Sequence, residues 1–169
     1  MSRAATSPLV FAWSQFGPYH MDRCEALAQA QAGRREVIGL EMVSQGEVYA
    51  WAPSGAGQEF RKLTLFPGKR LSQVSMGRQF ATLLRACLRT RAKHVFLCDY
   101  HLPQVFLAAL LLRLCGRRVI IMQDSKFDDK PRSLWRELGK ALLYAPYHAA
   151  FVGGSRSKSY LEFLGMPEA

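Results

Sequence analysis

Short apolar runs alternate with longer segments of helical period along nearly the whole chain, and this alternation constrains the fold more than any other feature. The apolar runs have the length of strands and are mostly continuous, which is typical of strands buried on both faces of a parallel sheet. They occupy residues 9–13, 36–42, 63–66, 94–98, 118–122 and 149–152, and a further short strand is predicted at 48–51.

Segments with helical spacing of apolar residues fill most of the intervals between these runs. Helices are predicted at residues 21–32, 72–91, 103–115, 131–145 and 158–164. Strands joined by helices imply right-handed crossovers and a parallel sheet that is covered on both faces. The sequence therefore predicts a single α/β domain over residues 1–169, a Rossmann-like doubly wound parallel sheet in a three-layer α/β/α arrangement.

Two of the predicted helices have distinctive apolar patterns. Residues 103–115 are apolar nearly all round, so we expect that helix to be buried on more than one side. In the helix at 131–145 the apolar residues mark one face, formed by Leu134, Trp135, Leu138, Ala141, Leu142 and Ala145. We interpret Trp135, and also Trp51, as packing residues rather than as platforms for a sugar ring.

Length and composition favour one domain with a substantial core, since the chain has 169 residues and 49% hydrophobic content. No stretch approaches the roughly 20 apolar residues of a membrane span, and residues 1–8 lack the apolar segment of a signal peptide. The cysteines are far apart, without a C-x-x-C pair or a Cys/His metal spacing, and lie at positions 24, 87, 98 and 115. This pattern indicates buried, reduced thiols and a cytoplasmic protein.

The net charge of +10 is compatible with nucleic acid, anionic membranes or phosphorylated ligands as partners. The sequence contains no zinc-finger spacing, no RNA-binding aromatic motif and no basic helix followed by heptads. We therefore expect no nucleic-acid partner.

Ligands of open parallel sheets bind outside the carboxyl ends of the strands, so the residues that follow each predicted strand are the candidate site. After the first strand comes the segment 14–20, which contains Gly17, Tyr19 and His20 but not the G-x-G-x-x-G fingerprint. Gly17 allows backbone amides to approach a ligand at the start of the next helix. A plain turn between strand and helix is an equally good interpretation.

After the strand at 94–98 come Asp99, Tyr100 and His101. A carboxylate at this position can accept hydrogen bonds from sugar hydroxyls, and a histidine can move a proton near neutral pH. The alternative is that Asp99 caps the helix that begins near Pro103.

After the strand at 118–122 an amide, a carboxylate, a hydroxyl and an ammonium follow in succession, at Gln123, Asp124, Ser125 and Lys126. A structural turn rarely needs all four, so we interpret this segment as facing a ligand. Asp128 and Asp129 are interpreted as caps for the helix at 131–145, with Pro131 in its first turn. No third ligand group accompanies these acids, so no metal is expected.

Two stretches together resemble the bacterial family 4 ("group 1") glycosyltransferases. The first covers residues 122–132, and the second combines residues 149–154 with Tyr160-Leu161 and residues 164–167. The resemblance implies one half of a GT-B fold, in which two Rossmann-like domains face each other across a cleft. It implies that this chain is the N-terminal, acceptor-binding half, that the donor-binding C-terminal domain is absent, and that the chain alone is inactive.

The resemblance also implies roles for individual residues. The loop with Gly17, Tyr19 and His20 would approach the phosphates of a nucleotide-sugar. Many relatives have a histidine after the fifth strand that contacts the transferred sugar, and here Gln123 or Asp124 stands near that position. Asp124 is therefore our candidate catalytic residue. The residues expected to bind the acceptor are Asp99, Tyr100, His101, Gln123, Ser125 and Lys126. The expected reaction retains anomeric configuration and needs no metal or other cofactor.

Two further expectations concern partners. Relatives often act on lipid-linked or membrane-surface acceptors, so a cluster of cations is expected to contact an anionic membrane at its inner face; these are Lys69, Arg70, Arg78, Arg85 and Arg89. A solvated helix face explains the same cations. The alternative function is a non-catalytic Rossmann-like module that binds a nucleotide, a polyanion or a protein partner. A third hypothesis is one half of a different GT-B enzyme, such as a sugar-nucleotide epimerase.

Overall fold

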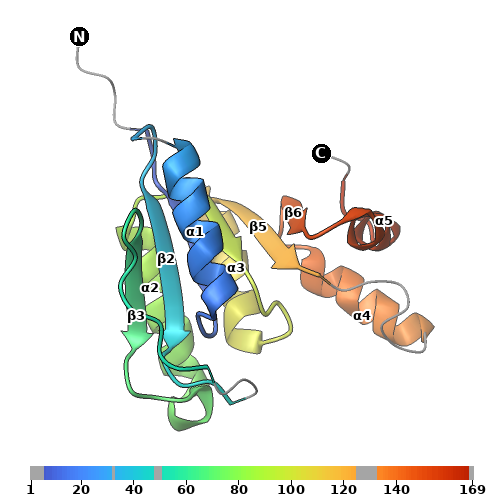
Figure 1. Ribbon diagram of the computed structural model, residues 1–169. Coiled ribbons are helices and arrows are strands. Elements are labelled where there is room, and N and C mark those ends of the chain that lie inside the picture. The colour runs from blue at the N-terminus through green and yellow to red at the C-terminus, as the bar shows by residue number, and fades with distance from the viewer. Residues whose placement is uncertain (1–5, 32, 48–50, 125–132, 168–169) are drawn as a thin grey trace.

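A computed structural model describes residues 6–31, 33–47, 51–124 and 133–167. It contains a six-stranded, all-parallel sheet in the order β3-β2-β1-β4-β5-β6 (Figure 1). The strands are β1 (Leu9–Trp13), β2 (Val37–Val43), β3 (Arg61–Phe66), β4 (His94–Leu97), β5 (Arg118–Gln123) and β6 (Ala149–Val152). The helices are α1 (Pro18–Gln31), α2 (Met76–Arg89), α3 (Pro103–Leu114), α4 (Leu134–Tyr144) and α5 (Ser155–Phe163), with a short 3-10 turn at Leu71–Gln73. The predicted three-layer α/β/α fold is confirmed.

The strand order reverses at β1, which pairs with β2 on one side and with β4 on the other. Right-handed crossovers then place α1 on one face of the sheet and the helices that follow β3 on the other. Figure 1 shows α1 in front of the sheet, with α2 and α3 behind it. A topological switch point of this kind leaves a crevice at the carboxyl ends of the two central strands.

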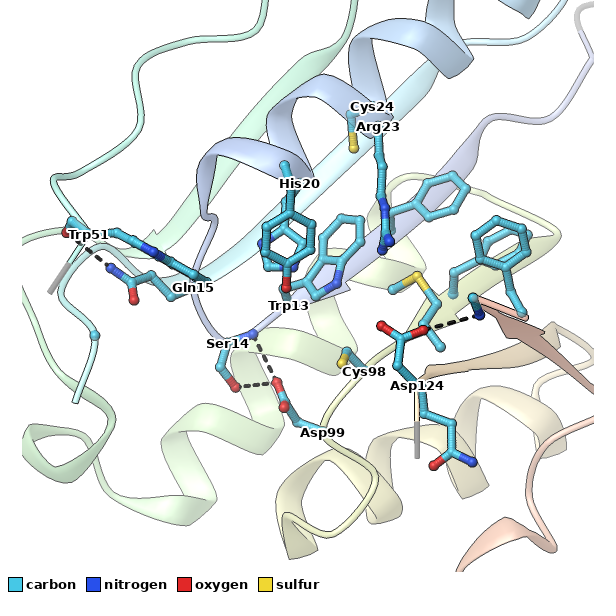
Figure 2. A pocket seen from close by; sticks show the side chains of 18 of the residues that line it. Trp13, Ser14, Gln15, His20, Arg23, Cys24, Trp51, Cys98, Asp99 and Asp124 are labelled. Atoms are coloured by element: carbon cyan, nitrogen blue, oxygen red, sulfur yellow. Dashed lines mark hydrogen bonds between the residues drawn. The ribbon is translucent and has the colours of Figure 1, made fainter. Parts of the chain in front are cut away.

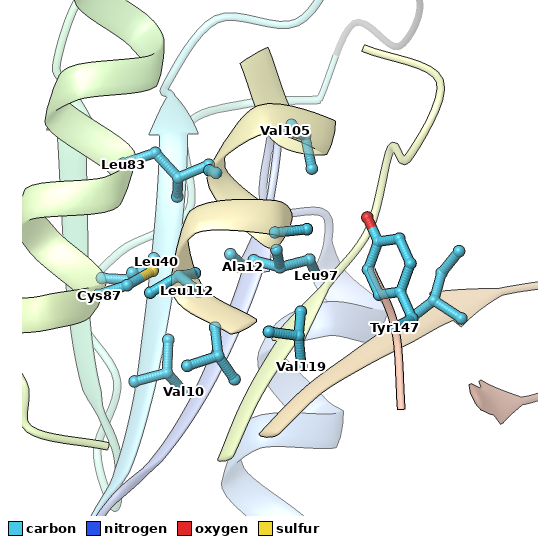
Figure 3. Packing of buried hydrophobic residues seen from close by; sticks show 14 of the residues in the cluster. Val10, Ala12, Leu40, Leu83, Cys87, Leu97, Val105, Leu112, Val119 and Tyr147 are labelled. Atoms are coloured by element: carbon cyan, nitrogen blue, oxygen red, sulfur yellow. The ribbon is translucent and has the colours of Figure 1, made fainter. Parts of the chain in front are cut away.

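Alternate residues of the central strands feed two separate cores. Val10 and Ala12 belong to the larger core, under α2 and α3, which Figure 3 shows together with Leu83, Cys87 and Leu112. On the other face, Leu9, Phe11 and Trp13 join a smaller core under α1. Every helical residue in that smaller core belongs to α1, so β4, β5 and β6 have little helical cover on this face within the described part of the chain.

The connection from β2 to β3 contains no helix in its described parts, 44–47 and 51–60, and none was predicted there, although its two strands are parallel. The predicted long helix at 72–91 is divided, because the backbone is extended at Val74 and Ser75 before α2 begins. The predicted strand at 48–51 lies largely outside the described residues.

The apolar helices also differ from expectation. α3 is not buried on more than one side, since Leu107, Leu110 and Leu111 are partly exposed and Leu114 is 73% exposed. α4 begins at Leu134, and the predicted first turn at Pro131 with its caps Asp128 and Asp129 lies outside the described residues. Trp135 is 81% exposed and is therefore not a packing residue within this chain.

Candidate functional site

A cleft of about 1010 Å³ lies on the α1 side of the sheet and extends to the carboxyl ends of β1, β4, β5 and β6. Its lining is mostly apolar along the strands and polar at the carboxyl edge. The polar side chains there include Ser14, Gln15, Asp99 and Asp124, which Figure 2 shows, and also His101. The cleft lies where the open-sheet rule places a ligand.

A row of aromatic rings forms the floor of the cleft. The Phe11 and Phe96 rings are stacked with centroids 4.3 Å apart, and Phe96 meets Phe151 edge-on at 6.2 Å. Trp13 continues the row at 6.1 Å from Phe11. Phe151 remains more than half exposed because no helix of the described chain covers β6 on this face. Phe151 is therefore the ring of this row that is most accessible to a ligand, since Phe11 and Trp13 are only 6% and 7% exposed.

A second aromatic group closes the end of the cleft near α1. His20 stacks on Trp13 with centroids 4.6 Å apart and contacts Tyr19 and Trp51. Trp51 lies against Gly17 so closely that a Cβ on Gly17 would be 2.6 Å from its ring. Gly17 is therefore needed here for the packing of Trp51, and Trp51 lines the cleft.

His20 is held as a neutral ring. Its Nδ1 accepts a hydrogen bond from the Gly17 amide at 2.9 Å. Burial, with a smaller contribution from the charge of Arg23, lowers the pKa of His20 to about 4, despite an opposing hydrogen bond with the backbone of Gln15. His20 thus fixes the turn at the start of α1. The Gly17 amide, predicted to approach donor phosphates, is already engaged by His20 in this structure.

A buried ion pair between Glu41 and Lys62 contacts the same turn through the Phe16 amide. The Glu41 carboxylate is 1% exposed and accepts hydrogen bonds from the Phe16 amide at 3.0 Å and from the Thr64 hydroxyl at 2.7 Å. Lys62 Nζ lies 2.9 Å from the same carboxylate and also donates to the carbonyl and hydroxyl of Ser54. A buried carboxylate needs such partners, and here they tie β2, β3 and the loop after β1 into one unit.

Asp99 also holds the loop after β1. Its Oδ2 accepts hydrogen bonds from the Ser14 amide at 3.1 Å and from the Ser14 hydroxyl at 2.5 Å, as Figure 2 shows. The Asp99 backbone has a φ of 57°, a left-handed conformation that aspartate tolerates better than most residues. The interpretation of Asp99 as a helix cap is wrong, because the cap residue of α3 is Leu102 and no side chain caps that helix.

Asp124 follows β5 and projects into the cleft. Its Oδ1 accepts a hydrogen bond from the Gly153 amide at 3.1 Å, and a Cβ at Gly153 would be 2.7 Å from that oxygen. Gly153 thus lets the carboxylate approach the end of β6. Arg23 reaches from α1 toward the side of the cleft where Asp124 lies, and its guanidinium is 5.1 Å from the centre of the Tyr19 ring (Figure 2). The exposed carboxylate and this cation flank the aromatic floor.

Two predicted ligand-binding residues point toward the other core. The Gln123 side chain accepts a hydrogen bond from the Tyr144 hydroxyl at 2.8 Å, and its buried Nε2 has no hydrogen-bond partner among the described residues. The Tyr100 ring packs against Tyr144 with centroids 4.8 Å apart. Gln123 still lines the cleft, whereas Tyr100 does not.

Two cysteines line the cleft, Cys24 and Cys98. Burial raises the pKa of Cys24 to about 12. Burial, reinforced by the negative charge of Asp99, raises the pKa of Cys98 to about 12. Both thiols stay protonated at neutral pH and are poor nucleophiles. Among the described residues no three His, Cys, Asp or Glu side chains are grouped to hold a metal ion.

The structure brings together most of the predicted site residues. Tyr19, His20, Asp99, His101 and Asp124 line one cleft, although they come from three separate strand ends. Ser125 and Lys126 lie outside the described residues. The aromatic floor and Arg23 were not predicted from the sequence, and Trp51 was predicted to be a packing residue only. The signal for the floor was the alternation Leu9-Phe11-Trp13, which places both rings on one side of β1.

Comparison of the sequence with protein-family models returned no match. Comparison with curated proteins likewise returned none. Within the described ranges, no helix is long and apolar enough to cross a membrane.

Proposed function

We propose that this chain is the acceptor-binding half of a two-domain, GT-B-type glycosyltransferase that moves a sugar from a nucleotide-sugar to a hydroxyl acceptor. The cleft at the carboxyl edge carries the proposal, because it combines the exposed rings of Tyr19 and Phe151 with the carboxylates Asp99 and Asp124. Ring faces suit the apolar faces of a sugar, and carboxylates accept hydrogen bonds from its hydroxyls. The resemblance of residues 122–132 and 149–167 to family 4 transferases supports the same conclusion.

Asp124 is the proposed polar group nearest the reacting sugar. One of its oxygens is oriented by the Gly153 amide, so the carboxylate is positioned before a ligand arrives. Asp99 has its Oδ2 committed to Ser14, and we assign it the role of positioning the loop beside the acceptor. His101 is exposed at the rim and is the remaining candidate for contact with acceptor hydroxyls.

Binding to this chain tests the proposal. A thermal-shift screen against acceptor glycans, glycolipid headgroups and nucleotide-sugars is expected to show stabilisation by acceptors only. Asp124→Asn is expected to weaken acceptor binding by about 10- to 100-fold, the effect of losing a hydrogen bond to a charged group. Asp22→Asn, which removes a carboxylate from the exposed side of α1, is the matched control and should bind normally.

The same screen separates the alternative function. Stabilisation by nucleotides or polyanions, without any response to glycans, would favour a non-catalytic binding module. In the two-domain parent protein, Asp124→Asn is expected to lower turnover strongly while the circular dichroism spectrum stays unchanged. Wild-type turnover of that variant would remove Asp124 from the mechanism.

A further inference from the structure

α4 is an amphipathic helix whose apolar side faces away from the protein. Trp135, Leu138 and Leu142 recur at intervals of three and four residues and therefore share one face. Their exposed fractions are 81%, 48% and 72%. A helix on the surface of a sheet normally turns such a face inward, so the arrangement calls for an apolar partner.

The polar side of α4 is the side that contacts the rest of the chain. Glu137 accepts a hydrogen bond from the Tyr160 hydroxyl of α5 at 2.6 Å, and Lys140 donates to the same hydroxyl. Tyr144, which is 3% exposed, donates to Gln123 of β5. These three residues lie on the opposite side of the helix from the tryptophan and leucines, so the contacts fix the apolar side outward.

α3 adds a second exposed apolar stripe. Leu107, Leu110, Leu111 and Leu114 share its outer face, while Val105, Ala108, Ala109 and Leu112 are buried beneath it. Arg113 donates to the backbone carbonyls of Ala145 and Tyr147, which joins the end of α3 to the end of α4. We call the seven exposed side chains the outer apolar face; they are Leu107, Leu110, Leu111, Leu114, Trp135, Leu138 and Leu142.

Cations border this face on the side of α2, which packs beside α3 through a hydrogen bond from Gln104 to Gln79 at 2.7 Å. Arg78, Arg85 and Arg89 are exposed on α2. Neither α2 nor α3 contains an acidic residue. Within the described chain, none of these three arginines lies within ion-pair distance of a carboxylate. Positive charge beside an exposed apolar face is complementary to an anionic, apolar surface.

We propose that the outer apolar face docks on an anionic lipid bilayer, with Trp135 and the leucines in the interface and the α2 arginines against lipid headgroups. A second copy of this chain would bring the same uncompensated arginines together, which disfavours self-association. α3 lies across the sheet from α1 (Figure 1), and no described residue of α3 or α4 lines the cleft. Docking therefore leaves the cleft open, and the proposal does not depend on the proposed function.

Vesicle co-sedimentation of the whole chain tests the proposal. Binding is expected to vesicles of phosphatidylcholine with phosphatidylglycerol, and only weakly to phosphatidylcholine alone. Arg85→Gln/Arg89→Gln should lower the partition coefficient by about fivefold for each arginine removed. Arg34→Gln/Arg35→Gln, in the turn after α1, removes the same charge elsewhere and should bind like the wild type.

The apolar contribution is tested separately. Leu110→Ser/Leu114→Ser should lower the partition coefficient by at least about tenfold, whereas Phe163→Ser, at an exposed apolar position on α5, should not. Tryptophan emission should shift to the blue on anionic vesicles and be quenched by brominated lipid, and Trp135→Phe should abolish both effects. Circular dichroism of every variant monitors folding.

Three results would overturn the proposal. The first is equal binding to neutral and anionic vesicles. The second is binding that is lost with the arginines but unaffected by the leucine substitutions, which would mean a purely electrostatic contact. The third is a dimer in sedimentation velocity that the leucine substitutions dissociate, without any binding to vesicles.

Discussion

The buried Glu41–Lys62 pair makes a sharp prediction about stability. Lys62→Met should destabilise the protein by about 3–5 kcal/mol, because it leaves the Glu41 carboxylate buried without its cation. The carboxylate is 1% exposed and the lysine 5%, so water cannot replace the lost partner. The neighbouring pair Arg61–Glu36 has a similar distance, 2.9 Å, but both side chains are 50% exposed. Arg61→Gln should therefore cost less than about 1 kcal/mol.

Urea unfolding followed by circular dichroism measures both changes. With a typical slope of about 1–3 kcal/mol/M, the loss in Lys62→Met lowers the midpoint by roughly 2 M, while Arg61→Gln moves it only slightly. The double variant Glu41→Gln/Lys62→Met should lose less unfolding free energy than the two single variants lose in sum, by at least about 1 kcal/mol. If Lys62→Met and Arg61→Gln lowered the midpoint equally, burial would not determine the strength of this pair.

Further predictions concern the cleft. The pKa of His20 is lowered from 6.5 to about 4, so the folded state keeps its full stability above pH 6.5. As the pH falls from 6.5 toward 4, the free energy of unfolding should decrease by on the order of 3 kcal/mol, because the unfolded state is protonated first. In His20→Gln the urea midpoint should depend less on pH. Gly17→Ala should displace the Trp51 ring, shift its emission to the red and weaken acceptor binding. Gly77→Ala, where a Cβ meets open space on α2, should instead stabilise the helix by about 0.5–1 kcal/mol. Cys115 is exposed while Cys24, Cys87 and Cys98 have raised pKa values, so a thiol reagent should label one cysteine before unfolding and four after it.

The fold was predictable because the strands of this sheet are continuous apolar runs and glycine or proline follows most helices. Periodicity also located the apolar stripe of α4, but it could not give the direction in which the stripe faces. That direction depends on Tyr160 and Gln123, which meet the polar side of α4 only in the folded chain. The same limit applies to α3, whose all-round apolar pattern suggested burial although its outer leucines are exposed.

The sequence predicted which strand ends form the candidate site, but it did not predict which individual side chains point into the cleft. The open-sheet rule correctly brought Asp99, His101 and Asp124 to one cleft. Side-chain direction was the missing information. Gln123 and Asp124 are adjacent in sequence, yet alternation sends one toward Tyr144 and the other into the cleft. The aromatic floor spans β1, β4 and β6, so the alternation in β1 indicates only its Phe11 and Trp13 part.

Asp99 allows the structural and ligand-binding roles to be separated by substitution. Its left-handed backbone costs alanine about 1–2 kcal/mol but costs glycine nothing, and asparagine tolerates it. Its carboxylate also accepts two hydrogen bonds from Ser14, and each contact with a charged acceptor contributes about 1.5–3 kcal/mol. Stability should therefore decrease in the order Asp, Asn, Gly, Ala, with glycine above alanine by about 1 kcal/mol.

Ser14→Ala removes only the hydroxyl contact with Asp99 and supplies the matched comparison. If Asp99 acts by positioning the loop, Ser14→Ala and Asp99→Asn should weaken acceptor binding to similar, moderate extents, because each loosens the same contact. A ligand-binding Asp99 would instead give a much larger loss of affinity in Asp99→Asn, with stability close to that of the wild type. Thermal unfolding and glycan titration of the same samples distinguish the two, and the second outcome would refute the positioning role.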